Sequence, residues 1–203
     1  GEMYQSRAAQ QQTRSTLLGA RRGTIYDRNN NVLARSADVW NICISPAEID
    51  EKRLPTIAKD LGEILDVDPA YITEQAQDRR VYYKRIARRV NVETRDKVLE
   101  YISTKGSEVS GVFPEPDTKR YYPYGSLAST VLGFTNSDNH GAYGLESYYD
   151  KTLSGTPGVV VSAKNAWGID MPYKYTQRND ASDGKSLVLT NDAGVQHFVE
   201  RHP

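Results

Sequence analysis

The chain has 203 residues with 26 Lys+Arg and 26 Asp+Glu, so its formal net charge is zero and no overall field draws it to nucleic acid or to an anionic bilayer. Its mean hydropathy of -0.65 is more polar than a compact globule of this length needs, which favours an elongated shape. The single Cys43 excludes an internal disulfide and a cysteine metal site, and no apolar run approaches the ~20 residues of a membrane span.

The chain opens with a polar stretch, 1–18, that is rich in glutamine and predicts a stalk helix with no N-cap. We expect a segment upstream of it. Ile25 and Val32–Ala34 then flank the turn-forming residues Asp27–Asn31, which predicts a hairpin.

A strand is predicted after this hairpin. Trp40, Ile42 and Ile44 alternate at period two, which indicates a half-buried strand, and Pro46 ends it.

Residues 46–112 predict a small α/β subdomain inserted between strands of the first unit. The apolar spacing over 54–65 is typical of an amphipathic helix, and Asp68–Pro69 supplies an N-cap and a first helical residue for a second one. A strand over 81–90 and a helix over 93–102 complete the subdomain.

The remaining elements do not alternate regularly, so the predicted class is α+β. The stretch 111–123 is expected to be extended, and Pro114 and Pro116 keep it off a central strand. After it we expect a helix over 124–134, a helix over 144–153 that Gly155 stops, strands over 158–165 and 185–190, and a last helix that begins near 191.

Short matches to serine-acyltransferase motifs raise an enzymatic alternative. Ser182–Lys185 fits S-x-x-K, Ser137–Asn139 fits S-x-N, and Lys151 opens an incomplete K-T-G. The chemistry requires the serine at a helix N-terminus with the lysine one turn later. Asp183–Gly184 is instead a turn dipeptide, and the motifs are in the wrong order, so we expect chance matches.

A basic run raises a second alternative, a nucleic-acid binder. Arg79–Arg89 holds six cations and two tyrosines in eleven residues, and such interleaving can bind single strands. With zero net charge, we favour a solvated strand surface. His140, His197 and His202 are scattered and lack carboxylates at ligand spacing, so no metal site is expected.

Five charged residues in separate segments are flanked by glycines and aromatics: Arg22, Asp27, Arg28, Arg120 and Glu146. They could meet and cross-brace a non-local junction through arginine–carboxylate contacts. They could equally be surface charges that each contribute little. Spacing alone leaves both options open.

Four segments in order resemble class B penicillin-binding proteins. "RRGTIYDRNNNVLA" (21–34) resembles the signature R-G-x-I-x-D-R-N-G-x-x-L-A, although Asn31 stands in place of the usual turn glycine. "RYYPYG" (120–125) resembles R-x-Y-P-x-G, and "GAYGLESYYDKTLSGTPG" (141–158) resembles G-x-x-G-L-E-x-x-Y-D-x-x-L-x-G-x-x-G. The stretch 183–200 resembles the strand and helix that lead into the transpeptidase domain of that family.

The resemblance implies an organisation for the whole chain. It would comprise a juxtamembrane stalk helix (1–18), a pedestal or dimerisation domain (19–190) and a stub of the first transpeptidase helix (191–203). The pedestal would be an elongated α+β assembly of extended strands and short helices, with 46–112 as its inserted α/β head.

The implied function is that of a positioning and docking module in peptidoglycan synthesis, with no catalysis and no cofactor of its own. The parent would be a membrane-anchored serine-type D,D-transpeptidase of division or sporulation, whose active site lies downstream of residue 203. It would work at the extracytoplasmic face of the bacterial membrane and bind penicillin.

The resemblance also implies partners and site residues. The main partner would be a polytopic glycosyltransferase of the shape–elongation–division–sporulation type, with other cell-wall or division proteins and a homodimer as further options. Contact with the membrane would run only through the absent anchor. The residues implied to form a structural or allosteric junction are Arg22, Gly23, Asp27, Arg28, Arg120, Tyr122, Pro123, Gly125, Gly144 and Glu146.

Overall fold

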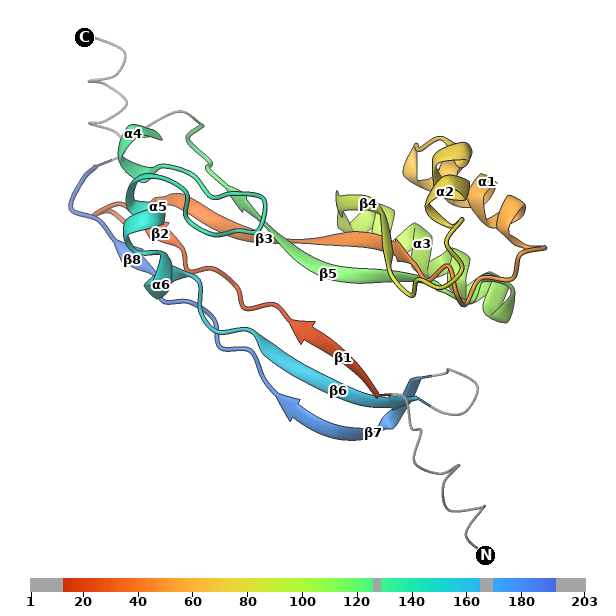
Figure 1. The fold of residues 1–203 in the computed structure, drawn as a ribbon. Helices are drawn as coiled ribbons and strands as arrows, with labels where there is room; N and C mark the ends of the chain where they lie inside the picture. The colour runs from red at the N-terminus through yellow and green to blue at the C-terminus, as the bar shows by residue number, and fades with distance from the viewer. Residues whose placement is uncertain (1–12, 126–128, 165–169, 193–203) are drawn as a thin grey trace, which may run out of the picture. The chain divides into compact units, whose positions relative to one another are not determined.

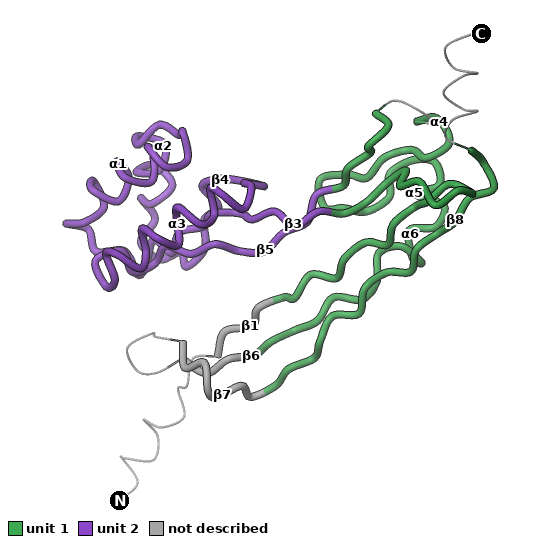
Figure 2. The backbone as a smooth tube through the Cα atoms, turned by 180° about the vertical axis from the view of Figure 1, so that it is seen from behind, with its two compact units in different colours: residues 1–36, 120–203 green, residues 37–119 purple. Residues whose placement is uncertain are grey.

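The structure is a computed structural model that describes residues 13–125, 129–164 and 170–192 (Figure 1). The chain divides into two compact units (Figure 2). Unit 1 comprises residues 1–36 and 120–203, and unit 2 comprises the continuous stretch 37–119. Unit 2 thus contains the predicted insertion 46–112 together with residues on both sides of it.

Unit 1 contains a three-stranded antiparallel sheet in the order β1–β6–β7. The strands are β1 (Thr13–Leu18), β6 (Gly158–Lys164) and β7 (Asp170–Asn179), and Figure 1 shows them side by side. Residues 13–18 are therefore not part of a stalk helix, as predicted, but an edge strand. The prediction failed there because β1 pairs along its full length with the valine-rich β6, and tertiary pairing overrides local pattern.

Strand β7 was not predicted from the sequence. Its stretch alternates tyrosines with polar residues, but Pro172 argues against a central strand. The structure resolves this conflict by placing β7 at the edge of the sheet, where a missing N–H can be tolerated.

The predicted hairpin is confirmed in unit 1. Strand β2 (Ile25–Tyr26) pairs antiparallel with the start of β3 (Val32–Ile44), and β8 (Leu187–Val188) pairs parallel with β2. An apolar core lies under these strands. It consists of Ile25, Leu33, Ala34, Leu132 and Leu153.

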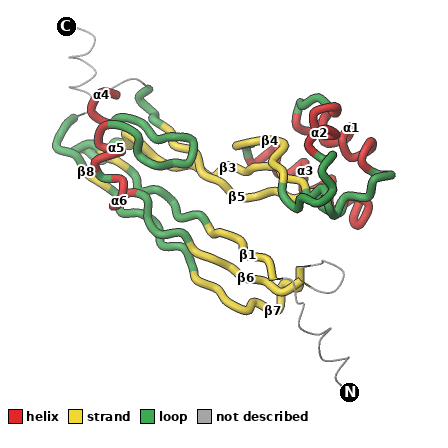
Figure 3. The backbone as a smooth tube through the Cα atoms, viewed as in Figure 1, coloured by secondary structure: helices red, strands yellow, loops and turns green. Residues whose placement is uncertain are grey.

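The helices of unit 1 are short, as the red segments in Figure 3 show. They are α4 (Ser129–Leu132), α5 (Gly144–Tyr148) and α6 (Asp150–Leu153). The single helix predicted over 144–153 is thus two helices, because the backbone leaves the helical region at Tyr149, with φ -101° and ψ 20°.

Unit 2 has three longer helices: α1 (Leu54–Leu65), α2 (Pro69–Gln75) and α3 (Val92–Lys105). A 3-10 turn, η1 (Gly106–Val109), follows α3. The α2 prediction is confirmed in detail, because the Asp68 carboxylate accepts the Ala70 N–H at 2.8 Å and caps the helix. Figure 1 shows these helices gathered beside β4 (Lys84–Val90).

Strand β3 is more deeply buried than its alternating pattern predicts. Ile42, Cys43 and Ile44 are all 0% exposed, so both faces are covered in unit 2. Burial raises the pKa of the Cys43 thiol to about 11, which makes it a poor nucleophile at neutral pH. The buried Asn41 accepts the N–H of Arg89, which has φ 53° at an irregularity between β3 and β4.

Strand β5 (Val112–Tyr121) pairs with β3 and confirms the predicted extended segment. The mixture of helices and open sheets confirms the α+β class. Within the ranges described above, no helix combines the length and apolar character needed to cross a bilayer. The predicted last helix, like residues 1–12 of the predicted stalk, lies outside those ranges.

Candidate functional site: a buried charge cluster in unit 1

Glu146 is the centre of the candidate site. It lies on α5 and is fully buried, with 0% of its side chain exposed. Arg22 Nε donates to Glu146 Oε2 at 2.7 Å, and Arg120 Nε donates to Glu146 Oε1 at 2.7 Å. One carboxylate therefore joins two arginines that are 98 residues apart in sequence (120 minus 22).

Arg22 donates hydrogen bonds to both side-chain and main-chain oxygens of this region. Besides the Glu146 carboxylate, it donates through Nη2 to the Glu146 carbonyl oxygen at 2.7 Å. Its Nη1 donates to Asp150 Oδ1 at 2.6 Å and to Ser154 Oγ at 2.9 Å. The guanidinium thus spans α5 and α6, and its planar fork fixes their relative geometry.

Arg120 ties the end of β5 to the segment before β2. Its Nη1 donates to the carbonyl oxygen of Gly23 at 2.7 Å and reaches Ser36 Oγ at 3.3 Å. The cluster is charge-balanced, since the two arginines face Glu146 and Asp150. Each buried charge therefore faces an opposite one, although Arg120 Nη2 is buried without a hydrogen-bond partner.

Gly23 lies where several main chains cross. Its N–H donates to the Leu153 carbonyl oxygen at 2.8 Å. A Cβ on Gly23 would lie 2.0 Å from the carbonyl oxygen of Lys185. Only a glycine therefore fits at this crossing.

Tyr122 completes the cluster from the end of β5. Its hydroxyl donates to Glu146 Oε1 at 3.3 Å, and burial together with the Glu146 charge raises its pKa. The chain then turns at Pro123, with the Gly125 N–H donating to the Tyr122 carbonyl oxygen at 2.9 Å. Proline at the second position and glycine at the fourth are typical of a type I turn.

Gly144 begins the helix that carries Glu146. It has φ 62°, and a Cβ there would lie 2.6 Å from the carbonyl oxygen of Val131. Glycine therefore allows α5 to start tightly against the end of α4.

The structure does not bring Asp27 and Arg28 into this cluster. Asp27 is fully buried and accepts the N–H groups of Asn29 and Asn31, each at 2.8 Å. It shapes its own hairpin turn, because short acidic side chains reach nearby backbone amides. Arg28 points elsewhere and pairs with Asp192 at 3.1 Å.

Sequence reasoning missed Asp150. It lies four residues after Glu146, a spacing that could place two carboxylates on one helical face. Beyond Arg22, it also accepts the Gly141 N–H at 2.6 Å. Burial alone would raise its pKa, but the Gly141 amide and the Arg22 guanidinium outweigh burial and hold the pKa below its ordinary value of 3.8.

Asp150 should make the free energy of unfolding depend on pH in the acid range. Because its pKa is lower in the folded state, its contribution is fully present above pH 3.8 and is lost as the pH falls through the folded pKa. We expect the contribution to stay below about 1 kcal/mol, since the carboxyl is partly exposed. Urea unfolding between pH 3 and 6 should show a smaller loss of stability in Asp150→Asn than in the unmodified chain. Equal slopes would contradict this.

The predicted turn at the S-x-x-K match is wrong, because residues 183–186 form neither a turn nor a helix. The Gly184 and Lys185 N–H groups donate instead to the distant carbonyl oxygens of Arg21 and Thr152, at 2.8 and 2.9 Å, and Ser182 forms an isolated antiparallel bridge with Thr156. The serine is therefore not at a helix N-terminus, and the geometry that the acyltransfer chemistry requires is absent.

The basic run has local structural contacts. Arg79 donates to the Ile49 carbonyl oxygen, Arg80 pairs with Asp78 at 3.0 Å, and Arg89 lies 3.8 Å from Asp117. These contacts favour the interpretation of a solvated strand surface over that of a nucleic-acid site. In the described residues no group of three or more His, Cys, Asp or Glu side chains could hold a metal ion, and His197 and His202 lie outside them.

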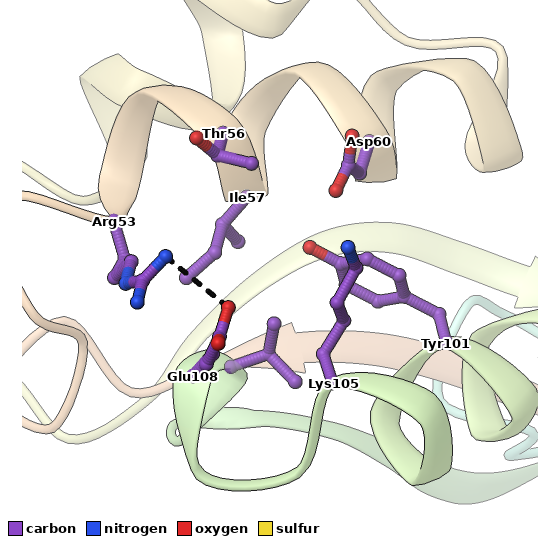
Figure 4. A pocket seen from close by; sticks show the side chains of 8 residues that line it. Arg53, Thr56, Ile57, Asp60, Tyr101, Lys105 and Glu108 are labelled. Carbon is purple, nitrogen blue, oxygen red and sulfur yellow. Dashed lines mark ion pairs between the residues drawn. The ribbon is translucent and has the colours of Figure 1, made fainter.

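A shallow hollow lies between α1 and α3 in unit 2 (Figure 4). Arg53 and Glu108 close one side of it as an ion pair at 3.2 Å, and both are about half exposed. Asp60 and Tyr101 face each other on its other side in Figure 4, and burial raises the pKa of Tyr101. Arg53 and Glu108 neutralise each other at the rim, so the hollow is a weaker candidate site than the buried charge cluster of unit 1.

A family model of the penicillin-binding protein dimerisation domain matches residues 17–189. Stage V sporulation protein D of Bacillus subtilis (strain 168) is 30% identical over 207 residues, covering 99% of this chain and 30% of that protein. Peptidoglycan D,D-transpeptidase FtsI of Escherichia coli (strain K12) is 30% identical over 187 residues, covering 89% and 30%. The chain therefore spans about a third of the length of these curated relatives.

Solved structures give the same answer for the fold. Penicillin-binding protein 2X of Streptococcus thermophilus matches with a TM-score of 0.69 and 26% identity over 93% of this chain and 31% of that one. PBP2 of Helicobacter pylori, solved in complex with MreC, matches with a TM-score of 0.71 over 95% and 38%, and its 21% identity supports the fold alone.

Proposed function

The chain belongs to the penicillin-binding protein dimerisation-domain family, and we propose that it is a non-catalytic module that positions a membrane-anchored D,D-transpeptidase of class B. The curated relatives named above include a peptidoglycan D,D-transpeptidase and a sporulation protein. The family match is to their dimerisation domain, so the catalytic serine of the parent would lie outside these 203 residues.

The observation that carries the proposal is the buried Glu146 between Arg22 and Arg120. A buried ion cluster is weak support for stability, since apolar residues of similar size can replace it without loss. What it supplies is one defined arrangement of the segments that meet there. Such a brace is what a module needs if it is to transmit the state of a partner to a catalytic domain.

The residues implied by the family motifs would then have different roles. Arg22, Arg120 and Glu146 would brace the junction directly, with Tyr122 as a fourth contact and Gly23 and Gly144 allowing the close approach. Asp27 would shape the hairpin turn and Arg28 would pair with Asp192, while Pro123 and Gly125 form the turn after Tyr122.

The partner would be another protein of cell-wall synthesis. PBP2 of Helicobacter pylori forms a complex with MreC, and this chain shares its fold. More narrowly, we propose a polytopic glycosyltransferase of the shape–elongation–division–sporulation type. The module would then act at the extracytoplasmic face of the membrane.

Arg120→Lys in the full-length parent tests the proposal. Lysine keeps the positive charge but has a single nitrogen, so it cannot reproduce the planar fork in which Nε bonds Glu146 and Nη1 bonds Gly23. In a reconstituted pair with the polymerising partner, we expect cross-linking per unit of glycan polymer to fall about five-fold or more, while polymerisation continues.

The matched control for this test is Arg178→Lys. Arg178 forms an exposed ion pair with Asp180 at 2.7 Å in the same unit. Its replacement should leave the ratio of cross-linking to polymerisation unchanged. An unchanged ratio in Arg120→Lys as well would overturn the proposed coupling role.

A further inference from the structure

The hairpin turn between β2 and β3 forms hydrogen bonds with the segment that follows β8. The Arg28 N–H donates to the Asn191 carbonyl oxygen at 3.0 Å. The Asp192 carboxylate accepts from two side chains through one oxygen, Oδ2. The donors are Asn29 Nδ2 at 2.8 Å and Arg28 Nη2 and Nε at 3.1 and 3.3 Å.

The buried Asp27 preorganises the turn for these hydrogen bonds. Asp27 is fully buried and holds the amides of Asn29 and Asn31 with one oxygen, while its other oxygen accepts Asn31 Nδ2 at 2.9 Å. Asn30 takes the left-handed conformation, with φ 62°. The turn is therefore shaped by its own residues, and little conformational entropy remains to be lost when Asp192 binds.

These hydrogen bonds also lengthen the pairing of β2 with β8, which would otherwise be very short. Strand β8 has two residues, and the Leu189 N–H extends the ladder to the Tyr26 carbonyl oxygen at 2.8 Å. The Arg28 amide then carries the pairing two residues further, to Asn191. The contacts of the turn thus hold the end of the described part of the chain, at Asn191 and Asp192.

We propose that the turn Asp27–Asn31 is a clasp for Asn191–Asp192 that fixes the path of the chain from β8 to Asp192. This rests on the proposed function, because a positioning module must control where the following polypeptide starts. Arg28 and Asn29 are positioning residues with Asp192 as their shared acceptor. Arg28 is 57% exposed, so the pair contributes geometry more than stability.

Amide hydrogen exchange on the 203-residue chain tests the clasp. In Asp192→Ala we expect exchange of the Arg28 amide to accelerate about five- to tenfold, since losing the three side-chain bonds frees Asn191. The amides of Asn29 and Asn31 should keep their protection, because Asp27 holds them independently. The matched control is Asp180→Ala, which removes an exposed aspartate of unit 1 paired with Arg178 and should leave all three amides unchanged.

Two results would overturn the clasp. One is a change of less than about twofold in the exchange rate of the Arg28 amide in Asp192→Ala. It would mean that the side-chain bonds to Asp192 do not hold Asn191 in place. The other is an equal acceleration at Asn29 and Asn31, which would mean that the turn is not preorganised. Arg120→Lys leaves this turn untouched, so a failure of the proposed function is distinguishable from a failure of the clasp.

Discussion

Replacing Glu146 by alanine is expected to lower the free energy of unfolding by about 3–5 kcal/mol. The substitution leaves the buried guanidinium groups of Arg22 and Arg120 facing each other with a net positive charge and only Asp150 to offset it. Urea unfolding at pH 7 measures the change. Glu63→Ala, at an exposed position of α1, should stay within about 0.5 kcal/mol of the unmodified chain.

A double-mutant cycle separates the ion cluster from simple loss of packing. Arg120→Ala alone leaves Glu146 with a single arginine, and the double variant removes both partners. We expect the double variant to be less destabilised than the sum of the single ones by about 1–3 kcal/mol. Additive effects, or a loss of less than about 1 kcal/mol in Glu146→Ala, would show that the contact between Glu146 and Arg120 contributes no stability.

Gly23→Ala is expected to lower the free energy of unfolding by about 3 kcal/mol or more. The added methyl group would lie 2.0 Å from a main-chain oxygen of Lys185, so no side-chain rotation relieves the overlap. Thermal unfolding followed by circular dichroism measures the loss.

Gly19→Ala is the matched control, only four residues earlier. A Cβ there meets nothing within 4 Å, and Gly19 is exposed. It should be neutral or slightly stabilising, because alanine restricts the unfolded chain. If the two variants unfold alike, the close crossing at Gly23 is not required for stability.

The local parts of the fold could be predicted because their signals are local. The α2 cap at Asp68–Pro69 and the hairpin around Asp27–Asn31 depend on residues within a few positions of one another. By contrast, β1 was predicted as a helix and β7 was missed. Strand β1 depends on pairing with β6, which lies far from it in the sequence. Strand β7 follows β6 closely, but its Pro172 argued against a strand.

The candidate site shows the same limit. The motifs identified Arg22, Arg120 and Glu146, but their spacing could not show that they meet, since surface charges have the same spacing. Asp150 was within reach of a helical-face argument and was not used. Asp192 lies in the family-like stretch 183–200, but no sequence pattern indicated its partners, which are more than 160 residues away.

The division of the chain has a consequence for the order of folding. Unit 2 is continuous and is complete once residue 119 has been made, whereas unit 1 needs both ends of the chain. Pairing of Leu18 with Gly158, and of Ile25 with Leu187, must wait until the late strands exist. Closing such long loops is slow, so during synthesis β1 will stay unpaired and β2 will be paired with β3 alone, with its other edge open. In newly made chains, unit 1 is therefore the part most prone to aggregate and to bind chaperones.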